Sequence, residues 1–221
     1  MCTSFAVYHQ EKAVYGMNFD TDDIDLKLKI SSYNDMNLFY FSALLENKYR
    51  DIAYFNSEGL FILTQAVEYG PSFKASCDEN NWFAFDIFDE ALKKTRKASE
   101  FFEILNKRVI SYPRNPLFPA LGLHTMIADK TGDAFILEEG NGTNIVSPVH
   151  NDFSQKNTLC TIVYEPIKNE IYISFKKDLS KKWKISVTDK TIQSMDGFLS
   201  NNKIQLTNDE VLVNDLISLY K

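Results

Sequence analysis

Apolar and polar positions alternate in short runs along the first third of the chain, a pattern typical of β-strands with one buried face. The runs 3–7 and 13–17 flank the polar turn 9–12, which predicts a hairpin at the beginning of the sequence. Further alternating or strongly apolar runs predict strands at 26–31, 38–45, 52–55 and 60–67, with a turn at 56–59 before the last of them.

The interval between apolar positions changes after residue 80. Apolar side chains now recur every three or four residues, at Phe83, Ile87, Phe88, Ala91 and Leu92. This spacing predicts an amphipathic helix, which the basic run 93–97 ends. Ser99 is expected to cap a second helix that continues to about Asn106.

The second half of the chain returns to strands. Hairpins are predicted for 124–129 with 133–138 and for 159–164 with 171–175, followed by a strand at 183–187 and an amphipathic helix at 208–220. The order of strands, helices and strands indicates a layered α+β fold with stacked sheets and helices outside. A length of 221 residues fits a single domain spanning 1–221.

Composition narrows the possible partners. A hydrophobic content of 44% with 24% charged residues is ordinary for a soluble globular protein. The net charge of −6 argues against a nucleic-acid partner. No apolar stretch is long enough to span a membrane, and the polar residues among the first twenty exclude a secretory signal. We therefore expect a cytoplasmic protein.

The three cysteines differ in context. Cys160 lies in the apolar run 159–163 and is expected to be a buried strand residue, whereas Cys77 lies in a polar loop. Neither the cysteines nor the three scattered histidines have the spacing of metal ligands, so we predict no metal and no cofactor. Cys2 stands out because it directly follows Met1.

Cys2 becomes the first residue if Met1 is removed, and its small size permits that removal. Its thiol then lies beside a free α-amine, whose ordinary pKa is about 8, so that much of it is neutral at cellular pH. A nucleophile and its general base can thus be carried by one residue.

Four segments resemble the choloylglycine hydrolase and penicillin V acylase family. Cys2–Val7 and Tyr15–Asp20 resemble the family's Cys-Thr opening strand and its second strand, which ends in Gly-Arg-Asn-x-Asp. Asn56–Leu60 resembles its Asn-Glu-Lys-Gly-Leu turn. Leu123–Gly132 with Ile136–Glu138 resembles its His-Trp-x-Ile-x-Asp-x-x-Gly hairpin ending in Val-Glu. The resemblance implies a four-layer αββα N-terminal-nucleophile sandwich that cleaves linear amide bonds of N-acyl small molecules.

The resemblance also implies roles for individual residues. Cys2 corresponds to the nucleophile and, through its amine, to the general base, and Asp20 to the carboxylate that positions this amine. Asn151 best matches an asparagine of the oxyanion hole, and Gln65 lies where the family has a second donor, with a register open by one residue. Without the resemblance, the sequence indicates a turn residue after a strand for Asp20, and a loop residue is an open alternative for Asn151. The family is commonly oligomeric, which implies a homo-oligomer.

Two arginines of the family are missing from the chain. Met17 stands where the family has the arginine before Asn-x-Asp, and the segment that carries the other is deleted, because 152–157 leads directly into the strand at 159. A methionine cannot replace an arginine in a charge-based role. Three interpretations remain open: hydrolysis of a less anionic amide, a degenerate ligand-binding relative, and an acyltransferase that uses the same thioester.

Aromatic residues follow the strand at 60–67 in a region that flanks the acyl pocket of the family. They are Phe73, Trp82 and Phe85. An apolar acyl pocket and ordinary core packing both remain possible for them.

Overall fold

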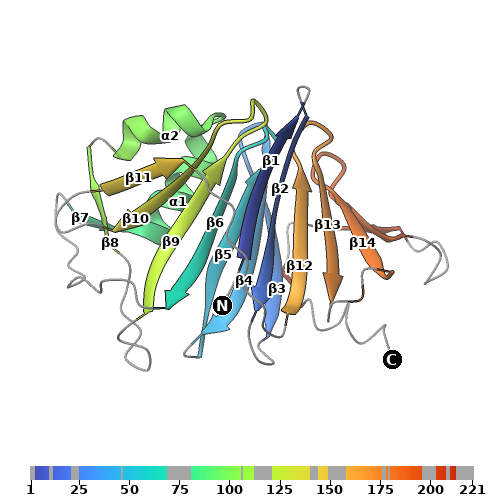
Figure 1. The fold of residues 1–221 in the computed structure, drawn as a ribbon. Helices are drawn as coiled ribbons and strands as arrows, with labels where there is room; N and C mark the ends of the chain where they lie inside the picture. Colours follow the sequence, from blue (N-terminus) through green and yellow to red (C-terminus); the bar gives the residue numbers. More distant parts are fainter. Residues whose placement is uncertain are drawn as a thin grey trace.

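Two antiparallel sheets and two helices make up most of the part of the chain that the computed structural model describes (Figure 1). The described residues are 3–9, 12–20, 25–45, 47–68, 81–105, 107–111, 121–139, 144–148, 158–175, 178, 180–195, 203–207 and 210–212. A short parallel pair, β7 (Asn81–Phe83) with β8 (Val109–Ser111), completes the described elements.

The seven-stranded sheet begins with the N-terminal hairpin and has the order β1-β2-β12-β13-β14-β15-β16. Its strands are β1 (Thr3–His9), β2 (Lys12–Asp20), β12 (Thr158–Glu165), β13 (Glu170–Phe175), β14 (Lys182–Ser186), β15 (Thr191–Ser194) and β16 (Ile204–Gln205). Strand β2 of the hairpin thus pairs with β12 from the second half of the chain, and β1 is the edge strand of this sheet (Figure 1).

The eight-stranded sheet has the order β11-β10-β9-β6-β5-β4-β3-β17. Its strands are β3 (Leu26–Tyr33), β4 (Met36–Leu45), β5 (Lys48–Asn56), β6 (Phe61–Glu68), β9 (Leu121–Ala128), β10 (Ala134–Glu139), β11 (Asn144–Pro148) and β17 (Glu210–Leu212). Alternate residues of these strands face the other sheet, as the pattern of period two predicts.

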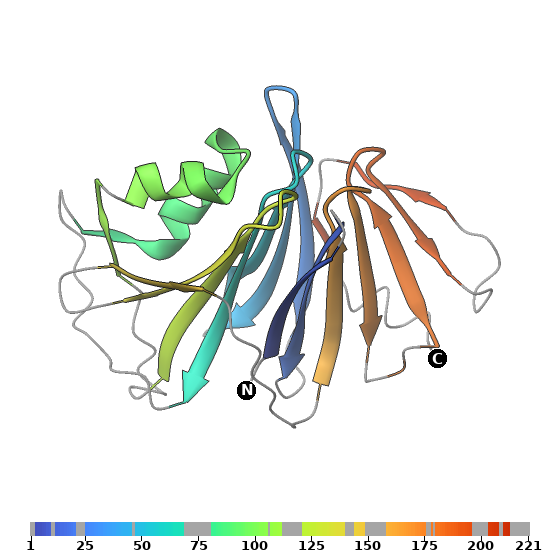
Figure 2. The same cartoon turned by 45° about the horizontal axis from the view of Figure 1, so that its top comes forward.

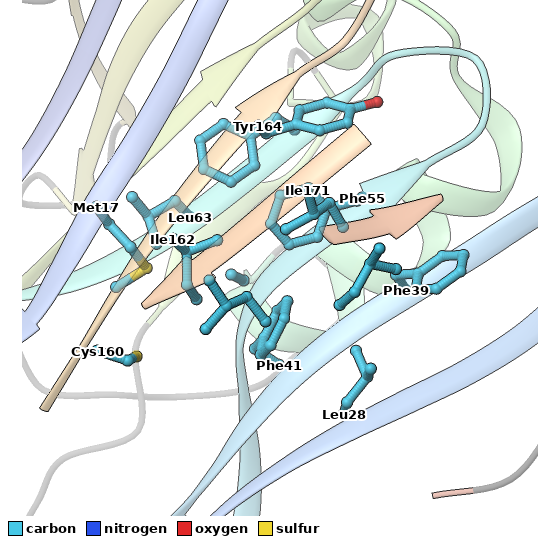
Figure 3. Close-up of a cluster of buried hydrophobic side chains, with 14 of the residues drawn as sticks. Met17, Leu28, Phe39, Phe41, Phe55, Leu63, Cys160, Ile162, Tyr164 and Ile171 are labelled. Atoms are coloured by element: carbon cyan, nitrogen blue, oxygen red, sulfur yellow. The ribbon is translucent and has the colours of Figure 1, made fainter. Parts of the chain in front are cut away.

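The largest apolar cluster lies between the two sheets, because strands of both contribute to it. Figure 3 shows Met17 and Ile162 of the seven-stranded sheet near Leu63 of the eight-stranded one. Aromatic rings fill the other part of the layer, where Phe55 stacks on Phe61 with ring centroids 4.9 Å apart. The two sheets are therefore held together mainly by burial of large apolar side chains.

Both helices cover the outer face of the eight-stranded sheet (Figures 1 and 2). Helix α1 (Ala84–Lys94) buries the predicted apolar positions Ile87, Phe88, Ala91 and Leu92, and α2 (Ala98–Leu105) buries Phe101. The described residues thus form three layers, helix, sheet and sheet. They include no helix on the outer face of the seven-stranded sheet, where the predicted αββα arrangement has its fourth layer.

The structure corrects two predicted helix features. Helix α2 begins at Ala98, so Ser99 lies inside its first turn; the Glu100 carboxylate instead reaches back and accepts a hydrogen bond from the Arg96 N–H at 2.7 Å. The predicted helix at 208–220 is wrong for 210–212, which forms β17 and pairs with β3, Val211 lying opposite Leu28. The edge of the sheet provides hydrogen-bond partners there that outweigh the helical spacing of the sequence.

All three predicted hairpins are confirmed, and the ends of their strands lie within three residues of the predicted ones. Short strands at β7, β8, β11, β15 and β16 were not predicted. None of the described helices is long and apolar enough to cross a membrane.

Candidate active site

The strand β1 begins immediately after Cys2, next to the end of β2. Thr3 pairs with Asn18, and Phe5 with Gly16. A Cβ atom on Gly16 would collide with the Phe5 ring and lie 2.9 Å from the Ile162 carbonyl oxygen, so only glycine lets the aromatic ring cover this part of the hairpin. Cys2 itself lies outside the described residues, but its neighbour Thr3 is fixed by this pairing.

Asp20 is the last residue of β2 and is only 7% exposed. It pairs with Thr158 of β12 across a bulge, where Cys160 already lies opposite Phe19. Among the residues that the structure describes, its buried Oδ1 atom has no hydrogen-bond partner. An unpaired buried carboxylate oxygen is costly and does not occur in an ordinary exposed turn, so the interpretation of Asp20 as a turn residue is wrong.

Gln65, 3% exposed, lies near the end of β6 and faces the seven-stranded sheet. Its Oε1 atom lies 2.9 Å from Ser4 Oγ, which donates to it, and 2.7 Å from His124 Nε2. Its amide nitrogen, Nε2, is buried and has no partner among the described residues. Ser4 is the second residue after Cys2, so this unpaired donor lies close to the start of β1.

The face on which Gln65 lies changes from apolar to polar along the strands. Leu63, Met126 and Ile136 lie opposite one another on β6, β9 and β10 and pack in the core. Two residues further along the same face, the corresponding row is Gln65, His124 and Glu138. The layer between the sheets therefore ends in a polar row at the end where β1 starts.

Met17 does not take part in this polar row. Its side chain is fully buried and packs with Leu63 and Ile162 in the core (Figure 3). Position 17 thus contributes apolar packing where the family has an arginine, and it places no charge beside the start of β1.

The other predicted residues divide between two groups. Asn151, Phe73 and the side chain of Trp82 lie outside the described residues. Phe85 packs in the cluster between the helices and the eight-stranded sheet, against Phe88, on the face of that sheet opposite to Gln65. Core packing, rather than an acyl pocket, is therefore confirmed for Phe85. Cys160 is buried in β12 as predicted.

Sequence reasoning missed Ser4 and His124 as members of this cluster. His124 stands two positions before the core residue Met126, so the alternation of β9 indicates that it faces inward. Ser4 likewise alternates with Ala6, which packs against the core. Their contact with Gln65 joins three strands far apart in sequence and had no signal in the sequence. The described residues contain no cluster of His, Cys, Asp and Glu able to hold a metal ion.

Solved structures of known enzymes resemble this arrangement of sheets. A cysteine-to-alanine variant of the conjugated bile acid hydrolase from Clostridium perfringens superposes with a TM-score of 0.63 at 11% identity, over 88% of this chain and 96% of that one. For the penicillin V acylase from Agrobacterium tumefaciens the TM-score is 0.63 at 10% identity, over 93% and 94% of the two chains. The chain shares the fold of these two enzymes.

The shared fold covers nearly the whole of each protein. An arginine-to-leucine variant of the Clostridium perfringens hydrolase gives a TM-score of 0.62 at 11% identity, over 93% of this chain and 98% of that one. No protein-family model and no curated protein matches the chain. The sheet arrangement expected from the four sequence segments is thus shared with a bile acid hydrolase and a penicillin V acylase, at identities of 10–11%.

Proposed function

We propose that this chain is a cysteine amide hydrolase that cleaves the linear C–N bond of an N-acyl small molecule through a thioester on Cys2, after removal of Met1. The observation that carries the proposal is a pair of buried, unpaired polar atoms near the start of β1. Asp20 Oδ1 is an acceptor, which suits an α-ammonium or amine, and Gln65 Nε2 is a donor, which suits an oxyanion.

Each step of the proposed reaction uses these groups. The Cys2 sulfur attacks the amide carbon while its proton passes to the α-amine, which Asp20 orients. Gln65 Nε2 and Asn151 donate hydrogen bonds to the carbonyl oxygen as it becomes negative. The C–N bond then breaks, and the leaving amine takes the proton from the α-ammonium. Water, deprotonated by the same amine, hydrolyses the thioester, which releases the carboxylic acid and restores the thiol.

The core position of Met17 supports a substrate without a strong negative charge near the reacting carbonyl. No arginine side chain is available at position 17 to bind a carboxylate, because the methionine is directed into the apolar layer. Neutral acyl amides and N-acyl amines are therefore preferred over acyl conjugates that carry an anionic group close to the amide.

A catalytically degenerate ligand-binding protein is the second candidate, and the same residue favours it. If the family's arginine is indispensable for chemistry, Met17 leaves a fold that binds an N-acyl molecule without cleaving it. An acyltransferase, in which an amine or thiol intercepts the thioester, shares every step up to hydrolysis and is separated from a hydrolase only by its acceptor.

A panel of chromogenic N-acyl amides, with intact-mass detection of an acyl adduct, tests the proposal. We expect wild-type protein to lack Met1 and to turn over a member of the panel, the Cys2→Ala variant to be inactive and Cys2→Ser to retain very little activity. Cys77→Ala is the matched thiol control and should keep full activity. Full activity of Cys2→Ala would overturn the proposal, and ligand binding with no acyl adduct would favour the degenerate relative.

Location, assembly, domain organisation and partner belong to the same proposal. We infer a cytoplasmic, homo-oligomeric enzyme in which residues 1–221 form one domain with a fourth, helical layer over the seven-stranded sheet. Its partner is a small N-acyl substrate, with no cofactor. Sedimentation equilibrium measures the oligomeric state, and a folded monomer at all concentrations would contradict it.

A further inference from the structure

The hydrogen bonds around Gln65 suggest what determines the orientation of its amide. A glutamine amide has a carbonyl oxygen that only accepts and an NH₂ group that only donates, and the two ends have nearly the same shape. Only one orientation directs a donor away from Ser4 and His124. The proposed oxyanion hole therefore depends on a group that can distinguish the oxygen from the nitrogen.

Ser4 cannot make this distinction by itself. Its hydroxyl lies 2.9 Å from the amide oxygen, and a hydroxyl group donates or accepts as its partner requires. His124 can make it, because each ring nitrogen either carries a proton or does not. At 2.7 Å from Gln65 Oε1, Nε2 must carry the proton in order to donate.

We propose that His124 is a positioning residue: its Nε2–H group holds the Gln65 carbonyl oxygen, so that the Gln65 NH₂ group is directed to the oxyanion formed at Cys2. This inference rests on the proposed function and extends it to a residue outside the proposed catalytic set. The buried Gln65 Nε2 atom, which has no partner among the described residues, is the group left available by this orientation.

The location of His124 fits such a role. It lies opposite Gln65 on the neighbouring strand β9, so the two side chains share one face of the sheet. Its ring is 26% exposed and therefore remains accessible to solvent, whereas Gln65 is buried. The other ring nitrogen, Nδ1, lies 3.8 Å from Glu138 Oε1, beyond hydrogen-bonding distance but near enough for attraction when the ring is charged. Both the neutral Nε2–H tautomer and the imidazolium donate to Gln65; the Nδ1–H tautomer does not.

Two substitutions at position 124 distinguish the role of the N–H donor from that of the aromatic ring. His124→Phe keeps an aromatic ring and removes the donor, and His124→Gln keeps an N–H donor and removes the ring. We expect kcat to fall about 10–100-fold in His124→Phe with little change in KM, and to recover largely in His124→Gln, because a misdirected donor weakens transition-state binding. Equal losses in both variants would indicate a packing role and overturn the inference.

A double-mutant cycle tests whether His124 acts through Gln65. Gln65→Leu should lower kcat about 10²–10³-fold. In this background His124→Phe should have no further effect, because the group that it orients is gone. Losses that multiply would show that His124 acts on something else.

The test also distinguishes failure of this inference from failure of the proposed function. Activity in Cys2→Ala would overturn the proposed function, whereas Cys2-dependent activity that is unchanged in His124→Phe would overturn only the role of His124. ¹⁵N chemical shifts of the His124 ring provide a reading that needs no turnover. We expect a proton on Nε2 in wild-type protein at its working pH; an unprotonated Nε2 would overturn the inference.

Discussion

Two buried polar clusters lie at opposite ends of β6, and they differ in whether their hydrogen bonds are satisfied. Just before the strand begins, Asn56, the last residue of β5, uses its whole side-chain amide. Its Nδ2 donates to the carbonyl oxygens of Leu92 and Thr95, both at 3.0 Å, and its Oδ1 accepts from the N–H groups of Glu58 and Leu60. Near the end of the strand, Gln65 accepts two hydrogen bonds at its oxygen, while its nitrogen has no partner in the part of the chain that the structure describes.

Asp129 and Asp20 make the same contrast. Asp129 is fully buried, and its carboxylate accepts from the Ala98 N–H at 2.7 Å and from the backbone and hydroxyl of Thr131. Asp129 thereby caps the start of α2, as Asn56 joins the end of α1 to the sheet. Asp20 is nearly as buried, yet its Oδ1 is unpaired among the described residues.

The contrast separates structural motifs from chemical ones within the family resemblance. Asn56 and Asp129 belong to the matched Asn-Ser-Glu-Gly-Leu and Asp-Lys-Thr-Gly segments, and both hold the helices against the eight-stranded sheet. Their turns also touch, because a Cβ on Gly59, at φ 97°, would lie 2.9 Å from Lys130 Cβ. Gln65 contacts β1 and β9 through its oxygen, but its nitrogen and Asp20 Oδ1 have no partner among the described residues. We infer that satisfied buried groups mark architecture here, and unsatisfied ones mark the site.

The largest expected effect on stability comes from removing the hydrogen bonds of Asn56. Asn56→Leu removes four hydrogen bonds and leaves two carbonyl and two N–H groups buried, so we expect the free energy of unfolding to fall by about 4 kcal/mol. Urea denaturation with an unchanged m-value measures it. A loss below about 1 kcal/mol would show that the four former partners of Asn56 bind water instead. The two clusters would then not differ in their contribution to stability.

Gly16→Ala tests whether both polar clusters depend on the β1–β2 hairpin, which contacts each of them. The added methyl group must displace Phe5 or separate β2 from β12, since it meets the Ile162 carbonyl as well. We expect a loss of about 2 kcal/mol, measured by thermal and urea unfolding. Phe5→Ala in the same background should recover part of it, because the ring is then absent; a double variant less stable than Gly16→Ala would contradict the steric explanation.

A single hydrogen bond of the satisfied cluster gives a smaller effect. The Tyr15 hydroxyl donates to the Asp129 carbonyl oxygen at 2.5 Å in a buried location. Tyr15→Phe removes this donor while keeping the ring and leaves the oxygen with only the Gly132 N–H, at 3.2 Å, so we expect a loss of about 1 kcal/mol in urea denaturation. Val14→Ala, on the other face of the same strand, is the control for general sensitivity of β2. No loss in Tyr15→Phe would mean that the pairing of this cluster carries no stability.

Much of the fold could be predicted from the sequence, and the reasons for the failures are physical. Strands of eight to ten residues, such as β2 and β4, contain enough alternating positions to be recognised. Strands of two to four residues contain too few, and β15, β16 and β17 exist because neighbouring edges supply hydrogen bonds. The segment 210–212 has helical spacing but pairs with β3, because an edge strand with unpaired backbone groups competes with a helix.

The candidate site was predicted only in part. Asp20 and Gln65 could be named because motifs in the sequence indicate them, and the alternation of β6 places Gln65 on the same face as Leu63. The partners of Gln65 could not, because Ser4 is 61 residues and His124 59 residues away in sequence. The contact with His124 depends on the pairing of β6 with β9, and the contact with Ser4 on how the two sheets face each other, neither of which a local pattern encodes.

The smallest expected change in stability comes from the unsatisfied cluster, and it distinguishes the two clusters most directly. Gln65→Leu replaces a buried amide, whose nitrogen has no partner among the described residues, by an apolar side chain of similar size. The desolvation cost of Nε2 therefore disappears. Ser4 and His124 lose their acceptor, but both are partly exposed and can bind water instead. We therefore expect the free energy of unfolding to change by less than about 1 kcal/mol, against about 4 kcal/mol for Asn56→Leu, in paired urea denaturations. A loss as large as that of Asn56→Leu would show that Gln65 holds the sheets together, and its unpaired nitrogen would then no longer mark a site.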